Sequence, residues 1–471
     1  MKALLVILAV AASTLPGFAR AGDDGCPVAA GRDLRQATRN DDIFAAGPCD
    51  PYTLGVQAYV WGFPIVEAAK IRLFFTRPDD PFSQRPPSVA GAALNHFGHG
   101  RILADPDNLS GVGPNNDTLY SNAVFDLSQG PFLIEFPDYG DRYYTFSVAH
   151  PDSSTTQSLG RRTHGSQLPP LFLHAADYAG PVPADAYEIA SADRYLMLFG
   201  RVLVKGPEDL DSIRALQDAI RVRKVAGGKP VEVPPPADED RLPAAAPDDP
   251  LAFLGQLRVA IGGMAVVPRD QALVERLRRF AFDAAALDAQ GRAELARGLR
   301  DGKAVVEGAS HRFGRWSGGW SVNTAGARFG SDYLLRAAVA KDQIYVTVPE
   351  EAIYPNARED SSHQPLTGAR RYVIRMPPPP VRGFWSITLY DDKGAMVQNP
   401  INRYSIGDRT PELKREADGT VAILISHDRP QAADANWLPA PAGPFYLMMR
   451  LYIPGAEITA GRWSPPPIQA R

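Results

Sequence analysis

The segment GVGPNNDTLYSNAVFDLS, residues 111–128, gathers side chains that could bind a ligand just before an alternating apolar run. Asn115, Asn116 and Asp117 supply amides and a carboxylate, and Tyr120 adds a phenol at the mouth of the following strand. The same residue types also form ordinary turns, because their side chains bond to nearby backbone. Under the ligand-binding interpretation, Asp117 holds the turn while Asn116 and Tyr120 contact a polyhydroxylated or carboxylated molecule.

A second candidate group lies along GDRYYTFSVAHPD, residues 140–152. Strand alternation places Arg142, Tyr144 and His150 on one face. Elimination from a uronate needs a cation at the carboxylate, a base and an acid, and these three side chains with Asn116 could supply those roles. The alternative for His150 taken alone is a hydrogen-bonded buried histidine, which we favour.

The second half of the chain contributes Arg403 and Tyr404 from NPINRYS and Asn436 from NWLP. Arginine beside aromatic rings suits recognition of a carboxylate or a sugar, through paired hydrogen bonds and stacking. The alternative is a corner motif in which Trp437 closes the end of a β domain and Asn436 bonds to backbone. For Trp437 we favour the corner, because aromatic side chains carry much of a core.

A metal is the less favoured interpretation of NHFGHGR. His96 and His99 are three residues apart and would share one face of a helix, with Asp117 as a third ligand. The two glycines of the motif weaken a helix, however. We therefore expect no cofactor, and we expect His99 to support the neighbouring turn.

The N-terminus MKALLVILAVAASTLPGFARA is typical of a cleavable export signal that ends at Ala21. The alternative, an uncleaved membrane anchor, needs about 20 apolar residues, and Ser13, Thr14 and Pro16 interrupt this run. We therefore expect a mature soluble protein, periplasmic or secreted, without a membrane span.

The chain has two cysteines, Cys26 and Cys49, and both follow the signal. In an oxidising compartment such a pair is expected to form a disulfide. Closing a loop of about 23 residues would stabilise the folded protein by roughly 3 kcal/mol, because it lowers the entropy of the unfolded chain. The net charge of −3 gives no reason to expect nucleic acid. The expected partner is a small or polymeric polar ligand, and the oligomeric state stays open.

The positions of the prolines and the periodicity of apolar residues predict the helices and strands that position these residues. Asp50 and Pro51 predict the start of a helix, which Pro64 should kink or divide. Strands are predicted from about 120 to 204, helices from 207 and from 251 to 309, and strands again from QIYVTVP onward. In SDYLLRAAVA, Asp332 and Arg336 are spaced for a helical ion pair, and FWSITLYD alternates with one face in the core.

This order contains no βαβ alternation and no GxGxxG, so the predicted fold class is mainly β with helical insertions: two antiparallel β domains joined by a helical segment. A length of 471 residues also fits two or three domains. The predicted division is a signal peptide at 1–21, an N-terminal helix plus β domain at 22–205, a helical segment with a proline-rich linker at 206–330 and a C-terminal β domain at 331–471.

Several long motifs resemble a known pair of bacterial domains. PNNDTLYSNAVFDLS, PDYGDRYYTFSVAH and SLGRRTHG resemble domain of unknown function 1254, and RFGSDYLLRAAVA, PPPVRGFWSITLYD and NWLPAPAGPFYLMMRLYIP resemble domain of unknown function 1214. The resemblance implies exported proteins with β-sandwich or jelly-roll-like domains and added helices. Some members are described as alginate-lyase-like. His150 stands where members more often carry an aspartate.

Two classes of function follow. The first is a cofactor-independent enzyme that acts on a polar or anionic, carbohydrate-like substrate such as a uronate polymer. The second is a non-catalytic ligand-binding or assembly protein of the cell envelope. A cleft that joins the 115–120 turn to the Arg403 region would favour the enzyme, and separate buried positions would favour the second class.

Overall fold

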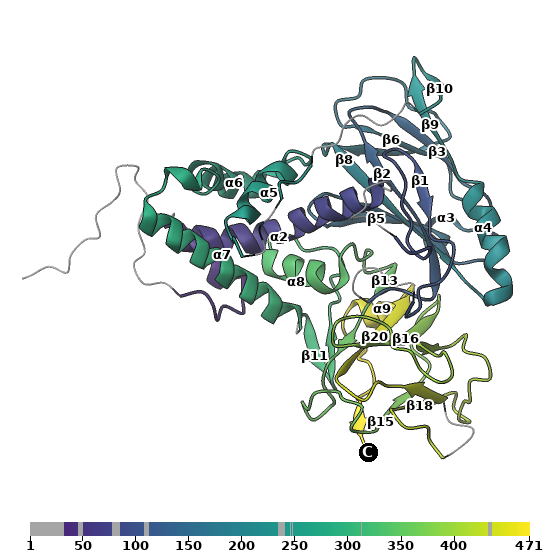
Figure 1. Ribbon diagram of the computed structural model, residues 1–471. Helices are drawn as coiled ribbons and strands as arrows, with labels where there is room; N and C mark the ends of the chain where they lie inside the picture. The colour runs from purple at the N-terminus through teal and green to yellow at the C-terminus, as the bar shows by residue number, and fades with distance from the viewer. Residues whose placement is uncertain are drawn as a thin grey trace, which may run out of the picture.

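Within the described residues, the chain is mainly β with helical parts, comprising 21 strands in four sheets and nine α-helices. Figure 1 shows most of the helices gathered on one side and two β domains, one above the other, on the opposite side. Residues 1–21, Cys26 and Cys49 lie outside the described residues, so the export signal, its cleavage site and the disulfide stay predictions. The computed structural model describes residues 33–45, 50–77, 85–107, 113–233, 241–244, 246, 248–311, 313–431 and 436–471.

The helices pack around α2, Pro51–Thr76, which begins where the sequence predicts. The Asp50 carboxylate accepts the Thr53 N–H at 2.9 Å, and Pro51 occupies the first helical position, where a missing N–H has no cost. The helix is continuous through Pro64, so of the two expected effects, a kink or a division, the division does not occur. Around α2 lie α1 Asn40–Phe44, α5 Ala252–Ile261, α6 Pro268–Phe280, the 3-10 turn η3 Ala284–Ala286, α7 Ala289–Ser310 and α8 Tyr333–Gln343.

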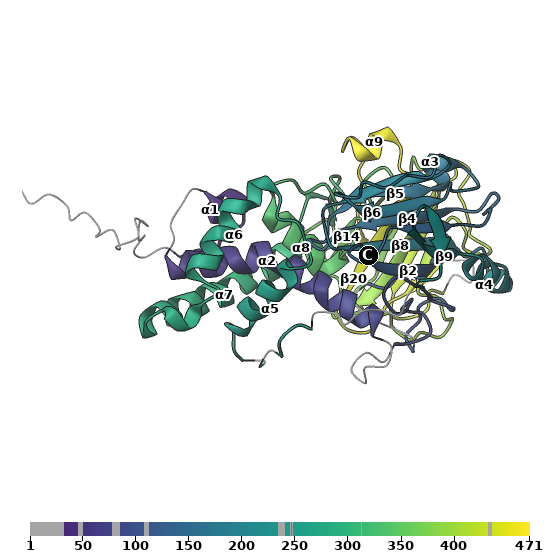
Figure 2. The same ribbon diagram turned by 90° about the horizontal axis from the view of Figure 1, so that it is seen from above.

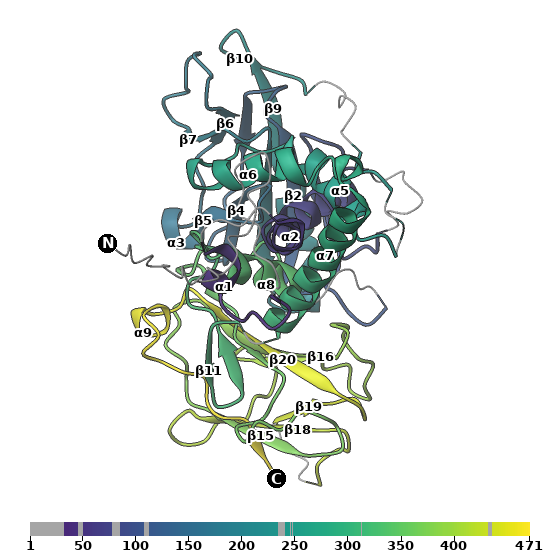
Figure 3. The same cartoon turned by 90° about the vertical axis from the view of Figure 1, so that its left-hand side faces the viewer.

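Helix α2 is buried on most sides because it is the axis of the helical body (Figure 3). Two glycines bring α7 close to it: a Cβ on Gly298 would lie 2.1 Å from the carbonyl oxygen of Tyr52, and a Cβ on Gly55 would lie 2.5 Å from that of Leu295. Figure 2 shows the far end of α2 reaching the β domains. Within the part of the chain that the structure describes, no helix combines the length and apolarity that a membrane crossing needs.

The first β domain consists of two five-stranded sheets that share one hydrophobic core. The first sheet has the order β1-β2-β8-β4-β5, with strands Phe97–His99, Thr118–Asp126, Tyr195–Leu203, Tyr144–Ala149 and Thr155–Gly160. The second has the order β10-β9-β3-β6-β7, with strands Lys229–Val231, Arg221–Ala226, Phe132–Glu135, Leu171–Ala175 and Tyr187–Ser191. Helical turns α3 Arg161–His164, η2 Pro207–Asp209 and α4 Leu210–Asp218 complete the domain.

The second β domain has two sheets of unequal size, again around one core. The larger has the order β11-β12-β14-β20-β16-β17, with strands Arg315–Ser317, Trp320–Val322, Asn356–Ala357, Phe445–Tyr452, Trp385–Asp391 and Ser405–Gly407, and β13 Ala352–Ile353 also pairs with β20. The smaller has the order β19-β18-β15-β21, with strands Asn436–Pro439, Val421–Ser426, Tyr372–Met376 and Gln469–Ala470. Helix α9, Ala456–Thr459, follows β20.

Three expectations about the strands are wrong. β6 pairs in parallel with β7, and β18 with β19, so neither β domain is wholly antiparallel. In the first case residues 176–186 carry the chain back before the second strand starts, which makes parallel pairing possible. The segment QIYVTVP, 343–349, is the end of α8 and a loop, not a strand, and β9 with β10 occupies part of the segment expected to be helical.

Strand β8 has two different buried faces, and this positions the candidate site. Leu196 and Leu198 point into the core between the sheets. Phe199 and Arg201 point the other way, toward α2 and a cavity. Because both faces are covered, the sequence of the strand is a continuous apolar run and does not alternate between apolar and polar residues. An arginine in such a run must therefore be buried.

Candidate functional site

The turn at 113–117 is packed against the second β domain. The Tyr390 hydroxyl donates to the carbonyl oxygen of Pro114 at 2.6 Å, and the Asn115 amide nitrogen donates to the hydroxyl oxygen of Tyr452 at 2.8 Å. Tyr390 belongs to the polar face of β16, whose other face is in the core as the alternation predicts. The asparagine-rich turn is therefore a contact between the two β domains.

Asp117 makes the charged part of this contact. Its carboxylate accepts the Ser386 hydroxyl at 2.6 Å and the Arg409 guanidinium at 2.6 Å. Its own N–H donates to the Asn115 side chain at 2.7 Å, which closes the turn. The Asn116 amide oxygen is buried without a hydrogen-bond partner among the described residues. Asp117 thus links the domains.

A cavity of about 450 Å³ lies beside this contact, a size typical of small-molecule sites. Its wall is made by the end of α2, by β2, β8 and β20, and by the loop after α8. Asn115 and Tyr120 of the predicted group line it, whereas Asn116 and Asp117 do not. The cavity joins the turn to the second β domain, but it does not include Arg403.

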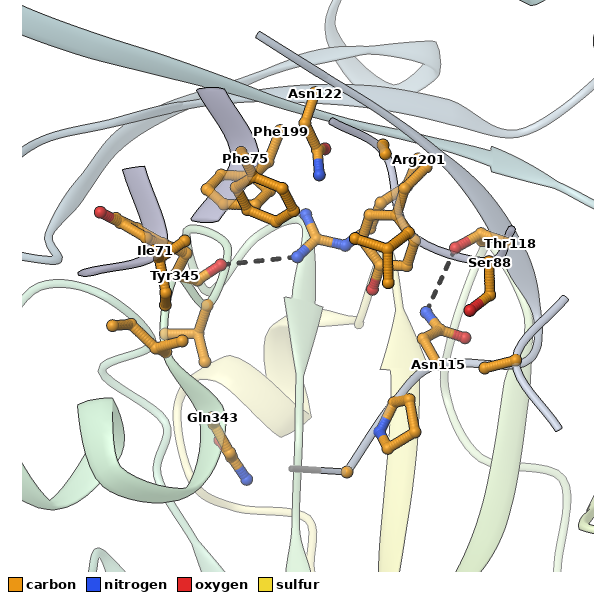
Figure 4. A pocket seen from close by; sticks show the side chains of 18 of the residues that line it. Ile71, Phe75, Ser88, Asn115, Thr118, Asn122, Phe199, Arg201, Gln343 and Tyr345 are labelled. Atoms are coloured by element: carbon orange, nitrogen blue, oxygen red, sulfur yellow. Dashed lines mark hydrogen bonds between the residues drawn. The ribbon is translucent and has the colours of Figure 1, made fainter. Parts of the chain in front are cut away.

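Arg201 is the chemically unusual residue of this wall. Its side chain is 7% exposed, and Nη1 has no hydrogen-bond partner among the described residues. Nη2 donates to the carbonyl of Tyr345 at 3.5 Å, longer than an ordinary hydrogen bond. Figure 4 shows the guanidinium directed into the cavity beside the rings of Phe75 and Phe199.

The charge of Arg201 is retained despite its burial. Burial lowers the pKa of Arg201, and the phenols of Tyr120, Tyr354 and Tyr452 raise it only where they are ionised, at high pH. Near neutral pH the phenols are neutral, and the guanidinium keeps its proton without a counter-charge. The Tyr120 ring centroid lies 5.3 Å from Cζ, because the two residues are paired across β2 and β8. Among the described residues, no carboxylate forms an ion pair with Arg201. The cavity therefore holds an unmatched positive charge.

Asn122 adds a second unmet hydrogen-bonding group at the same end. It is 5% exposed, its amide oxygen has no partner within the described ranges, and Figure 4 shows it directed toward the space that Arg201 enters. Arg450, which also lines the cavity, differs in this respect. It donates to the Thr388 hydroxyl at 2.6 Å and to the Tyr390 hydroxyl at 2.8 Å. Unmet capacity is thus concentrated around Arg201.

The loop after α8 closes the cavity in a strained conformation. Tyr345 has φ of 58°, in the left-handed region that bulky residues rarely adopt, at a cost of about 1–3 kcal/mol. Its ring packs on Phe199 with centroids 4.7 Å apart, while its carbonyl faces Arg201. This conformation ends the run that the sequence suggested as a strand, and it shapes the wall of the cavity.

Arg142 and Tyr144 do not lie at the cavity. Arg142 donates through both terminal nitrogens to the carboxylate of Asp209, so its charge is already paired. Tyr144 is in the core between the two sheets, stacked on Tyr139 with ring centroids 4.0 Å apart. Burial raises the pKa of Tyr144 to about 12. The strand face that they share is therefore largely a core face.

His150 follows the opposite end of β4 from Arg142. Its Nδ1 lies 2.7 Å from the Asp193 carboxylate, and its Nε2 lies 2.9 Å from the Thr156 hydroxyl. Both ring nitrogens thus have protein partners. The three residues proposed for catalysis are not brought together.

The polar residues singled out in the second half make local structural bonds. Arg403 donates to the carbonyl of Trp437 at 2.9 Å. Asn436 accepts the Lys414 N–H at 2.9 Å and donates back to its carbonyl at 2.8 Å. Tyr404 packs against an apolar cluster that includes Ala104 and Met448 of the cavity wall, but it does not itself line the cavity.

His96 and His99 lie at a short strand, not on a helix. His99 is the last residue of β1, whereas His96 lies in the bend before that strand. His99 bonds the Ser121 hydroxyl at 2.9 Å, and burial lowers its pKa to about 4. His96 bonds the carbonyl of Leu94 at 2.9 Å. In the described part of the chain, no group of three or more metal-ligating side chains is found.

Arg201, Asn122 and Arg450 were not among the predicted site residues. A signal for the arginines exists in the sequence, since each interrupts a long apolar run, RYLMLFGRVLV or PFYLMMRLYIP. Charged side chains are almost never fully buried unless paired. Asn122 carries no comparable signal.

Comparison with known proteins identifies both β domains. Residues 94–224 match the family described as protein of unknown function DUF1254, and residues 351–456 match the family described as protein of unknown function DUF1214. The chain therefore belongs to the proteins that carry these two domains in this order, as the motifs predict. No curated protein matches the chain.

Two solved structures match most of the chain in a comparison of structures. The crystal structure of the VPA0106 protein from Vibrio parahaemolyticus covers 89% of this chain and 100% of its own, with 24% identity and a TM-score of 0.62. A putative uncharacterized protein from Burkholderia cenocepacia covers 89% of this chain and 98% of its own, with 14% identity and a TM-score of 0.43. The first similarity establishes a shared fold.

Proposed function

We propose that this DUF1254–DUF1214 protein binds a small organic anion in the cavity between its two β domains. The observation that carries the proposal is the guanidinium of Arg201, which is buried, charged and directed into the cavity without a carboxylate partner in the described part of the chain. A buried charge without a counter-charge costs several kcal/mol. An anionic group on a ligand would supply the missing counter-charge.

The proposal takes the ligand-binding class of function in preference to the enzyme. A uronate lyase would need a cation, a base and an acid within reach of one substrate. Arg142 is paired with Asp209, His150 is bonded through both ring nitrogens, and neither lines the cavity. Because the sequence predicts an export signal at 1–21, we propose that binding takes place in the periplasm or outside the cell.

The frame around the cavity supports a rigid preformed site. In each β domain two sheets share one core, and this supports the assignment of both domains as β-sandwiches. The cavity then lies between two sandwiches, where the Asp117 contact fixes their separation. A rigid frame keeps the cost of ordering the site low when a ligand binds.

Calorimetric titration with small carboxylic acids and their neutral primary amides tests the proposal. The acids should bind and the amides should not, because only a carboxylate neutralises Arg201. Arg201→Met should weaken acid binding at least tenfold, about 1.4 kcal/mol. The control is Arg375→Met on β15, which does not line the cavity. It removes an exposed arginine paired with Glu416 and should leave Kd unchanged. Equal binding of acids and amides, or an unaffected Arg201→Met variant, would contradict the proposal.

A further inference from the structure

We infer that the anion bound in the cavity is a monocarboxylate with an aromatic body, rather than a sugar acid. This inference rests on the proposed anion site at Arg201 and adds the chemistry of the rest of the ligand. It is carried by three features of the wall: an aromatic cluster beside the guanidinium, few unbonded polar side chains away from it, and one buried cation, Arg201, whose hydrogen-bonding capacity is unmet among the described residues.

The aromatic cluster lies beside Arg201. The rings of Phe75 and Phe199 are edge to face, with centroids 6.0 Å apart, and Phe199 packs on Tyr345 at 4.7 Å. Phe74 continues this surface along α2. Aromatic rings favour edge-to-face or offset contacts with another ring, so an aromatic body attached to the carboxylate would extend this cluster.

Away from Arg201, the wall leaves ligand hydroxyls few partners beyond the Tyr354 hydroxyl, which is buried without a hydrogen bond among the described residues. Asn115 donates to Tyr452, and Gln343 donates to the carbonyl of Tyr354 at 3.2 Å. The remaining surface is largely apolar, with side chains that include Ile71, Ile102, Ile344, Val346 and Met448. A sugar acid would bury several hydroxyls against this surface without partners, which lowers affinity.

The charges limit the ligand to one carboxylate at this end. Lys70, the other flexible cation of the lining, bonds to Glu67 at 2.7 Å, and the Arg450 guanidinium donates to Thr388 and Tyr390. Asp342, also on the wall, is a carboxylate already paired with Arg358 at 3.4 Å, so this part of the wall offers no cation for a second carboxylate. A monoanion therefore matches the cavity better than a dianion.

Titration with three probes tests the inference: 3-phenylpropanoate, its neutral amide 3-phenylpropanamide, and galacturonate. We expect 3-phenylpropanoate to bind at least tenfold more tightly than either of the others. Phe75→Leu, which keeps an apolar side chain but removes the ring, should reduce this preference severalfold. The matched control is Phe253→Leu on α5, because Phe253 is also half-buried and stacked, on Tyr59 at 4.7 Å, but does not line the cavity.

The outcomes separate this inference from the proposal on which it rests. If galacturonate binds as tightly as 3-phenylpropanoate and Arg201→Met weakens both, the aromatic body is refuted while the anion site stands. If the amide binds as tightly as the acid and Arg201→Met has no effect, both are refuted. If none of the three probes binds, the aromatic inference is refuted, and the wider panel of acids decides on the anion site.

Discussion

Replacing Arg201 by methionine should stabilise the ligand-free protein. The change removes a guanidinium that is 7% exposed and leaves no carboxylate unpaired, because none is paired with it among the described residues. The interactions lost are a 3.5 Å hydrogen bond to the carbonyl of Tyr345 and a contact with the Tyr120 ring, worth about 1 kcal/mol together. Relief of the desolvation penalty is larger, so we expect the free energy of unfolding to rise by about 1–2 kcal/mol.

Arg336→Met is the matched control, because it alters an arginine that is just as buried but paired. Arg336 is 2% exposed and donates to the Asp152 carboxylate at 2.9 Å and to the carbonyl of Trp61 at 3.0 Å. Burial disfavours the charged form of Asp152, but Arg336 outweighs this effect and holds the pKa of Asp152 below its usual value. Loss of the arginine leaves that carboxylate unpaired and should cost about 3–5 kcal/mol.

Urea unfolding of ligand-free protein measures both changes. Far-ultraviolet circular dichroism and tryptophan fluorescence should be followed together, because a chain with several cores need not unfold in two states. The midpoint should rise for Arg201→Met and fall for Arg336→Met. If Arg201→Met lowers the midpoint as much as Arg336→Met, Arg201 is a structural residue and the reasoning from its unmatched charge is wrong.

Three further predictions concern other parts of the chain. Burial lowers the pKa of His99 to about 4 in the folded state, so as pH falls the unfolded state binds a proton on this histidine before the folded state does. The free energy of unfolding should therefore drop between about pH 6.5 and 4, and the urea midpoint of His99→Gln should drop less over this range. Asp117→Asn should weaken the ion pair between the β domains by about 1–3 kcal/mol and lower the melting temperature by several degrees in calorimetry, and an unchanged melting temperature would contradict this. Intact-mass analysis should find a mature N-terminus at Gly22 and a Cys26–Cys49 disulfide, whereas a retained signal or two free thiols would refute the export prediction.

The elements that rest on local signals were predictable from the sequence. The Asp50–Pro51 start of α2 depends on a cap and a proline within a few residues, and the two faces of β16 follow from strict alternation. The pair of Asp332 and Arg336 shows where a local rule fails. Asp332 instead caps α8 by accepting the Leu335 N–H at 3.0 Å, and Arg336 turns inward to a residue far away in the sequence.

The cavity could not be predicted in the same way, because its walls are distant in the sequence. Phe75, Arg201 and Arg450 come from three segments that only the packed fold brings together. The loop at Tyr345 adds a left-handed residue that no propensity favours. The sequence does indicate one thing: an arginine inside a continuous apolar strand must be buried, and a buried arginine is expected to have a counter-charge or hydrogen-bond acceptors close to it.

The location of Arg201, whose guanidinium has no carboxylate partner among the described residues, also gives a physical reason for the two β domains to occur as a pair. Arg201 comes from the DUF1254 region, whereas Met448 and Arg450 come from the DUF1214 region, so neither domain alone encloses the cavity. The turn at 113–117 contributes to both the domain contact and the cavity, since Asp117 bonds to Arg409 of the second β domain while Asn115 lines the cavity. A charge left unmatched where two domains are so firmly joined is a departure from good packing, and such departures are expected where a protein meets its ligand.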